Sequence, residues 1–199
     1  MGFSTIIDIL GAIIIGGLLL LILLRLNGTV SEHYITSGSD RSLQRGLAET
    51  AVVIEKDFRR MGFCADPYKI TEEMSVVISA DSEFISFYTD VNRDSTLDVM
   101  TYFLSDTNAL ASTKNPRDRI LYRQINADAP LMISTNITNF IFEYYDVFST
   151  RLATPVASPS MISHMKISIR VEDPEAYNEQ YSNAYWQQVR LTSKNLRKR

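Results

Sequence analysis

The sequence predicts an α+β fold in which a long N-terminal helix packs on an antiparallel β-sheet. Three observations predict it: an apolar run at the start, a second stretch with apolar residues at helical spacing, and about seven β-rich segments after that. Of the 199 residues, roughly 170 follow the predicted transmembrane helix, enough for one domain with its own core. We expect a transmembrane helix over residues 1–26, a linker and amphipathic helix over 27–66, and the sheet domain over 67–199.

The first element is the apolar run from Ile6 to Leu24, which Arg25 follows. A membrane-spanning helix needs about 20 apolar residues, and this run meets that need. No Lys or Arg precedes the run and no Ala-x-Ala cleavage site follows it, so we expect a retained anchor rather than a secretory signal peptide.

One acidic residue, Asp8, lies near the start of the apolar run. An ionisable group inside a membrane is costly, so Asp8 is a functional-site hypothesis. The alternative is an acid at the membrane surface, with the helix proper beginning at Ile9.

The second element is an amphipathic helix. We predict two interruptions of helical structure, one at Asn27-Gly28 and one at 37–40 (Ser-Gly-Ser-Asp). Ser39 or Asp40 could then cap a helix that runs to about Arg60. Gly62 predicts its end. We expect its apolar stripe to pack on the domain's own sheet, a partner helix being the alternative. The stripe consists of Leu43, Leu47, Ala51, Ile54, Phe58 and Met61.

The remaining elements are strands. Their segments are rich in β-branched and aromatic residues, and in 165–171 apolar and polar side chains alternate. That alternation is typical of an antiparallel sheet with one buried and one solvated face. We predict strands at 75–79, 84–88, 99–104, 120–125, 137–145, 165–171 and 186–191.

The composition of the chain argues against several classes of function. The net charge of −3 is too small to indicate a nucleic-acid partner, and we interpret the basic residues 190–199 as a solvated tail. With one cysteine, Cys64, the chain can form neither an intramolecular disulfide nor a cysteine-based metal site. The two histidines, His33 and His164, lie far apart in the sequence, and no hydrolase, metalloprotease or P-loop motif occurs. We therefore expect no enzymatic activity.

Three short motifs occur in order along the chain, at 2–6, 57–63 and 189–196, and together they resemble motifs of type IV pilin-like proteins. Gly2-Phe3-Ser4-Thr5-Ile6 resembles the prepilin processing signal, and 57–63 (Asp-Phe-Arg-Arg-Met-Gly-Phe) resembles the segment that ends the long helix of minor components. Segment 189–196 is similar to their closing strand. More narrowly, the chain resembles a minor pseudopilin of the J type or a minor pilin of the W type, from a type II secretion or type IV pilus system.

The resemblance implies cleavage after Gly2 by a prepilin peptidase, with Phe3 as the new N-terminus. It also implies an acid at the fifth mature position that pairs with the N-terminal amine of a neighbouring subunit. Here Asp8 would be the sixth mature residue, and one residue is about 100° of helix rotation. A leader of only Met1-Gly2 leaves three alternatives: atypical processing, no processing, or a true start upstream of the given one.

The function implied is structural: a subunit that helps to initiate or tip a filament, held in the inner membrane with an extracytoplasmic C-terminal domain before assembly. Its partners would be other pilin or pseudopilin subunits, the prepilin peptidase and the inner-membrane assembly platform. The rival hypothesis is a permanently membrane-anchored extracytoplasmic module that binds a ligand or partner.

An acidic segment between two predicted strands has the spacing of the first part of a calcium loop. The position that calcium loops give to glycine holds Ser95, and the position of the bidentate glutamate holds Thr101. The alternative is a hairpin turn, where Asp and Asn are favoured. The possible calcium ligands are Asp90, Asn92, Asp94, Asp98 and the Thr96 carbonyl.

Overall fold

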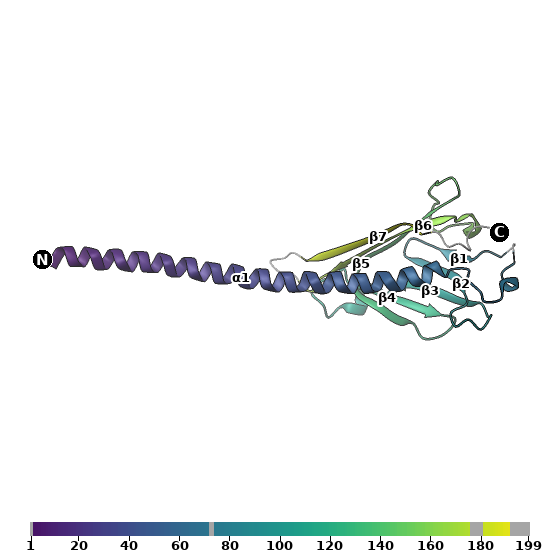
Figure 1. The fold of residues 1–199 in the computed structure, drawn as a ribbon, viewed down its shortest axis with the longest axis horizontal. Coiled ribbons are helices and arrows are strands. Elements are labelled where there is room, and N and C mark those ends of the chain that lie inside the picture. Colours follow the sequence, from purple (N-terminus) through teal and green to yellow (C-terminus); the bar gives the residue numbers. More distant parts are fainter. Residues whose placement is uncertain (1, 72–73, 176–180, 192–199) are drawn as a thin grey trace. The chain divides into compact units, whose positions relative to one another are not determined.

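The computed structural model describes residues 2–71, 74–175 and 181–191, and its first element is one helix, α1, from Gly2 to Arg59 (Figure 1). The predicted interruptions at 27–28 and 37–40 are wrong, because α1 is continuous through both. Glycine and serine only weaken a helix, whereas the residue that breaks one, proline, first occurs at Pro67. Thr29 donates its hydroxyl to the carbonyl of Arg25 (3.0 Å), a bond that a helix accommodates.

The chain divides into two compact units, Met1–Arg41 and Ser42–Arg199. In the part of the chain that the structure describes, one helical segment, Ile6–Ser31, is long and apolar enough to cross a membrane. Its leucine and isoleucine side chains are exposed, as expected of a surface that needs lipid or other helices around it. Because α1 begins at Gly2, the alternative prediction that the helix begins only at Ile9 is also wrong.

The second unit contains an antiparallel sheet of seven described strands, which follow one another in sequence order as a meander. Figure 1 shows this sheet curled around the C-terminal part of α1. The predicted α+β class and all seven strands are confirmed. The strands are β1 (Val77–Ala80), β2 (Phe84–Thr89), β3 (Asp98–Leu104), β4 (Arg119–Ile125), β5 (Leu131–Tyr145), β6 (His164–Glu172) and β7 (Asn183–Leu191).

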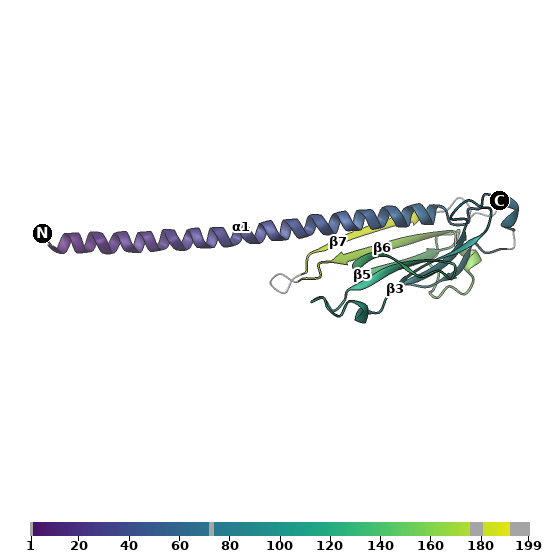
Figure 2. The same cartoon turned by 90° about the horizontal axis from the view of Figure 1, so that it is seen from below.

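The predicted apolar stripe of α1 covers one face of the sheet, as Figure 2 shows from below. Phe58 lies at the centre of the core, with ring centroids 5.2 Å from Phe87, 5.3 Å from Tyr102 and 5.7 Å from Phe142. The stripe therefore packs on the domain's own sheet, as predicted. Its other members in α1 are partly buried Leu43 and buried Leu47, Ala51 and Ile54, and the buried Met61 follows just after the helix ends at Arg59.

Short connections complete the domain. After α1 the chain turns at Gly62, which has a φ of 68° and donates its N–H to the Tyr88 carbonyl (2.7 Å). The edge of the sheet at β1 is capped by Val156, whose N–H bonds to the Ala80 carbonyl (2.8 Å). Short 3₁₀ turns are η1 (Pro67–Lys69), η2 (Thr107–Leu110) and η3 (Pro159–Met161).

Candidate functional site

The segment that ends α1 holds a buried charged cluster. Asp57 is 4% exposed, and its Oδ2 accepts a hydrogen bond of 2.7 Å from the Tyr102 hydroxyl. Arg123 Nε lies 2.7 Å from the same oxygen, in an ion pair whose N–H is not aligned with any described acceptor. Burial, and then the Asp57 carboxylate, raise the pKa of Tyr102 far above its usual value, so the hydroxyl stays a donor. The cluster joins α1 to β3 and β4.

Arg60 extends this junction to the acidic loop after β2. Its Nη2 donates to the carbonyls of Asp90 (2.6 Å) and Val91 (2.9 Å). The Thr89 hydroxyl in turn donates to the Arg60 carbonyl (2.9 Å), and the guanidinium lies over the Phe63 ring. Segment 57–63 therefore joins the C-terminal end of α1 to the sheet.

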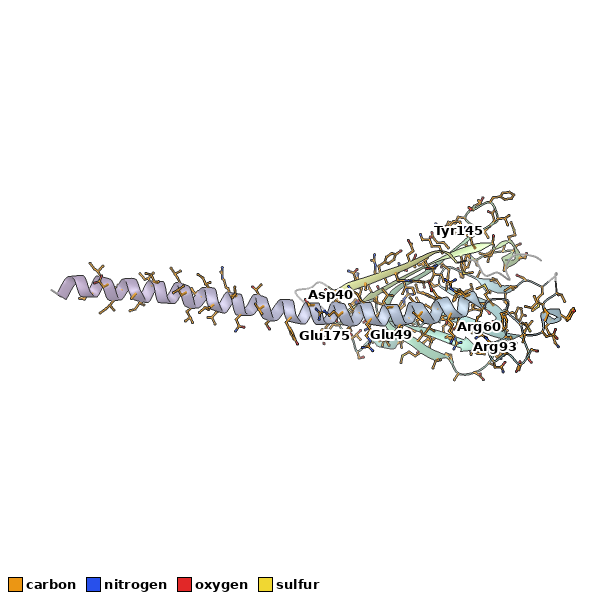
Figure 3. All side chains as sticks on the ribbon, in the orientation of Figure 1. Asp40, Glu49, Arg60, Arg93, Tyr145 and Glu175 are labelled. Atoms are coloured by element: carbon orange, nitrogen blue, oxygen red, sulfur yellow. The ribbon has the colours of Figure 1, made fainter. Side chains whose placement is uncertain are left out.

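Within the acidic loop, the buried carboxylate of Asp90 organises the backbone. It accepts N–H groups from Arg93 (2.6 Å), Ala65 (3.0 Å) and Ser95 (3.1 Å). Burial acts to raise the pKa of Asp90, but these three donors outweigh it and hold the pKa below its usual value. Figure 3 shows Arg60 and Arg93 at this end of the domain.

The other predicted calcium ligands also serve as acceptors inside the loop. Asp94 accepts from Asn92 Nδ2 (2.8 Å) and from the Thr96 N–H (2.7 Å). Asp98 accepts from the Val91 N–H (3.0 Å) and from Asn126 Nδ2 (2.8 Å). Among residues 2–71, 74–175 and 181–191, no three His, Cys, Asp or Glu side chains are grouped to hold a metal ion.

These bonds favour the hairpin-turn alternative, because the loop's own donors engage the oxygens that a calcium ion would need. Arg93 and Ser95 have φ values of 65° and 68°, typical of a tight turn. Calcium binding stays a prediction, and a raised Tm in millimolar calcium would support it.

The residues predicted for processing and assembly lie in the first unit. Gly2 is the first residue of α1, and Asp8 is exposed one to two turns further along the same helix. Phe3 also lies in α1, so the bond between Gly2 and Phe3, where cleavage is expected, is at the start of this helix. Pairing of Asp8 with an amine is a contact between two chains and stays a prediction. Of the predicted closing segment 189–196, residues 192–196 lie outside the described residues.

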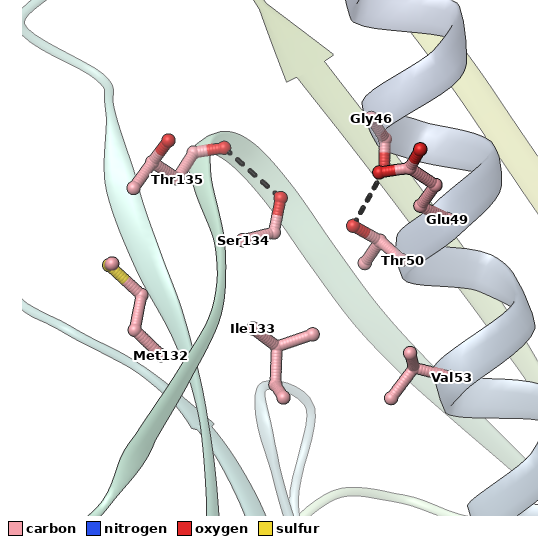
Figure 4. A pocket seen from close by; sticks show the side chains of 8 residues that line it. All are labelled: Gly46, Glu49, Thr50, Val53, Met132, Ile133, Ser134 and Thr135. Carbon is pink, nitrogen blue, oxygen red and sulfur yellow. Dashed lines mark hydrogen bonds between the residues drawn. The ribbon is translucent and has the colours of Figure 1, made fainter.

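A groove of about 450 Å³ lies between α1 and the start of β5 (Figure 4). Val53, Met132 and Ile133 form its apolar wall. At Gly46 there is open space, because a Cβ atom added to this residue would meet nothing within 4 Å outside the backbone of its own helix. Its polar rim is made by Glu49, Thr50, Ser134 and Thr135. Sequence reasoning missed this groove because its two walls are more than 70 residues apart.

One buried carboxylate lies outside these clusters. Asp118 is 1% exposed, and neither of its oxygens has a hydrogen-bond donor among the described residues. Burial raises the pKa of Asp118 above its ordinary value of 3.8, and the nearby Glu172 and Asp173 raise it further, whereas the positive charge of Arg117 opposes the rise.

We predict that Asp118→Asn stabilises the protein at pH 7 by about 1 kcal/mol, because it removes a buried, unpaired charge. An acid whose pKa is raised on folding loses stability as the pH climbs from its unfolded pKa through its folded pKa. The free energy of unfolding of the wild type should therefore fall progressively below that of the variant from about pH 4 upward. Urea unfolding between pH 3.5 and 7 measures this, and a constant difference would contradict it.

No protein-family model matches this chain. Searches among curated proteins and among solved structures find no match either.

Proposed function

We propose that this chain is a structural, non-catalytic subunit of a type IV pilin-like filament, a minor pseudopilin or minor pilin. Before assembly its N-terminal helix holds it in the inner membrane, and its sheet domain lies on the extracytoplasmic side. In the filament of a type II secretion or type IV pilus machine it helps initiation or forms the tip.

One observation carries this proposal: a single helix, α1, contains both the apolar segment Ile6–Ser31 and the stripe that covers the sheet. A separate anchor joined by a flexible linker would suit a tethered binding module better. A continuous helix instead suits a subunit whose apolar part leaves the bilayer to pack against neighbouring apolar helices. The buried joint at Asp57 and Arg60 supports the same proposal, because it fixes the helix to the domain.

Mass spectrometry of the N-terminus tests the proposal. With an active prepilin peptidase, we expect loss of Met1-Gly2 and an N-methylated Phe3. Gly2→Leu should keep the intact N-terminus, because it changes the residue after which the peptidase cuts. Wild-type protein that keeps Met1 in the presence of the peptidase would overturn the proposal. That result would favour the anchored binding module, for which the groove beside Gly46 is the candidate ligand site.

A further inference from the structure

The buried carboxylate of Asp118 lies where two parts of the sheet domain are fastened together. Asp118 ends the segment 113–118, which leads into β4, and this segment contacts the end of β6. Asn115 Nδ2 makes that contact by donating to Glu172 Oε2 (3.1 Å) and to the Asp173 carbonyl (3.3 Å). The segment before β4 and the end of β6 are therefore held in fixed positions near Asp118.

The basic side chains around Asp118 are engaged elsewhere. Each of the three basic residues in 114–119 forms an ion pair with an acid other than Asp118. The pairs are Lys114 with Glu175 (3.3 Å), Arg117 with Glu172 (2.7 Å) and Arg119 with Glu83 (2.8 Å). Both oxygens of Asp118 are buried and accept no hydrogen bond from the described residues. Burial of an unpaired carboxylate is unfavourable unless a proton or a cation neutralises it.

Acidic charge is in excess at this place. Glu172 and Asp173 both lie close enough to act on Asp118 electrostatically, and Arg117 is the nearby cation that opposes them. Three carboxylates beside one guanidinium leave two negative charges without a counter-charge. A proton on Asp118 would neutralise one of them, whereas a divalent cation would neutralise both.

We propose that Asp118 is the anchoring ligand of a divalent cation of the calcium type, which ties segment 113–118 to the end of β6. Calcium accepts carboxylates in the bidentate mode, and Asp118 offers two oxygens that no described donor occupies. The ion completes its shell of about six to eight oxygens with carbonyl groups and water. The Asn115 carbonyl is a candidate, because the Asp118 N–H and the Thr113 hydroxyl reach it only at 3.3 Å.

This site differs from the acidic loop after β2. In that loop, donors of the loop itself engage the carboxylates of Asp90 and Asp94, whereas Asp118 has no such donor among the described residues. The site also needs only one directly bound carboxylate, and so does not require the group of three side chains that the described residues lack. Figure 3 shows Glu175, which follows β6, at the end of the sheet domain opposite Arg93. The two sites can therefore be tested separately by mutation.

Thermal unfolding of the full chain in detergent at pH 7, followed by circular dichroism, tests this inference. In EDTA, Asp118→Asn should melt above the wild type, because the variant lacks the unpaired charge. In millimolar calcium chloride, the wild-type Tm should rise by roughly 3–5 °C once calcium is well above its dissociation constant, since the ion binds only the folded state. Asp118→Asn should lose this rise. The matched control is Asp94→Asn, which removes an acid from the loop after β2 and should keep it.

The inference requires that calcium raises the Tm of the wild type and of Asp94→Asn, but not that of Asp118→Asn. Loss of the rise in Asp94→Asn would contradict it, because calcium would then bind the acidic loop. A rise that sodium chloride reproduces at the same ionic strength would also contradict it, since screening of the acids explains that result without a bound ion. With no rise in the wild type, or equal rises in both variants, a proton and not a cation would be what neutralises Asp118. None of these outcomes depends on the proposed function, which N-terminal processing tests separately.

Discussion

Replacing Arg123 by methionine should lower the free energy of unfolding by about 3–5 kcal/mol, the usual cost of removing one partner of a buried ion pair. The Asp57 carboxylate would stay buried with only the Tyr102 hydroxyl as a described donor. For a chain of this size, the loss corresponds to a fall in Tm of roughly 10 °C. Thermal unfolding in detergent, followed by circular dichroism, measures it.

The same strand offers a matched control. Arg119 forms a bidentate ion pair with Glu83, with distances of 2.8 and 3.0 Å, but the Glu83 side chain is 43% exposed. Arg119→Met should therefore cost less than about 1 kcal/mol, because a solvated carboxylate needs no partner. Equal losses from the two substitutions would contradict the buried joint that we describe at the end of α1.

The double variant Asp57→Leu/Arg123→Met separates charge from packing. Replacing a buried ion pair by apolar residues of similar size is often neutral or stabilising. We therefore expect the double variant to recover most of the stability lost in Arg123→Met. If the double variant is as unstable as Arg123→Met alone, then Asp57 and Arg123 stabilise the fold through the packing of their side chains, and not because one neutralises the buried charge of the other.

The elements that could be predicted from the sequence are those in which buried and exposed side chains recur at a regular spacing along the chain. In β6, Met165, Ile167, Ile169 and Val171 are buried, whereas Lys166 and Arg170 are not, so the alternation located this strand. The prediction for β5 began at residue 137, but the strand begins at Leu131. Asn136 has a φ of 61°, and the register with β4 shifts nearby, so the alternation is interrupted where the first part of β5 lies.

Two features of the candidate site escaped sequence reasoning for a different reason. Asp57 lies within the apolar stripe, next to Phe58, and an acid in that position indicates a buried partner. The sequence does not show that the partner is Arg123, which is 66 positions away and reaches Asp57 only because β3 and β4 pair beneath α1. The groove likewise exists only once β5 lies beside α1.

The predicted helix breaks failed because local propensity is a weak guide inside a long helix. Asn27-Gly28 and Ser37–Asp40 contain residues that favour turns in isolation. In α1 the backbone hydrogen bonds continue through them, since nothing there removes an N–H group as proline does.

Phe58→Ala should destabilise the protein by about 3–5 kcal/mol, the range for truncating a buried aromatic side chain. Phe58 is fully buried, and its ring packs against Phe87, Tyr102 and Phe142. The cavity would open between α1 and three different strands, so no single neighbour can fill it. Chemical denaturation of the full chain in detergent measures the loss.

Val52→Ala on the same helix is the matched control, because Val52 is 66% exposed and its truncation should change stability by less than about 0.5 kcal/mol. If α1 carries the chain from the membrane into a filament, the contacts around Phe58 are what keep the sheet domain attached to it. Phe58→Ala should then also reduce incorporation into filaments at temperatures where the unfolded fraction rises, whereas Val52→Ala should not. Normal incorporation of a Phe58→Ala chain whose domain has unfolded would show that α1 enters the filament independently of the sheet.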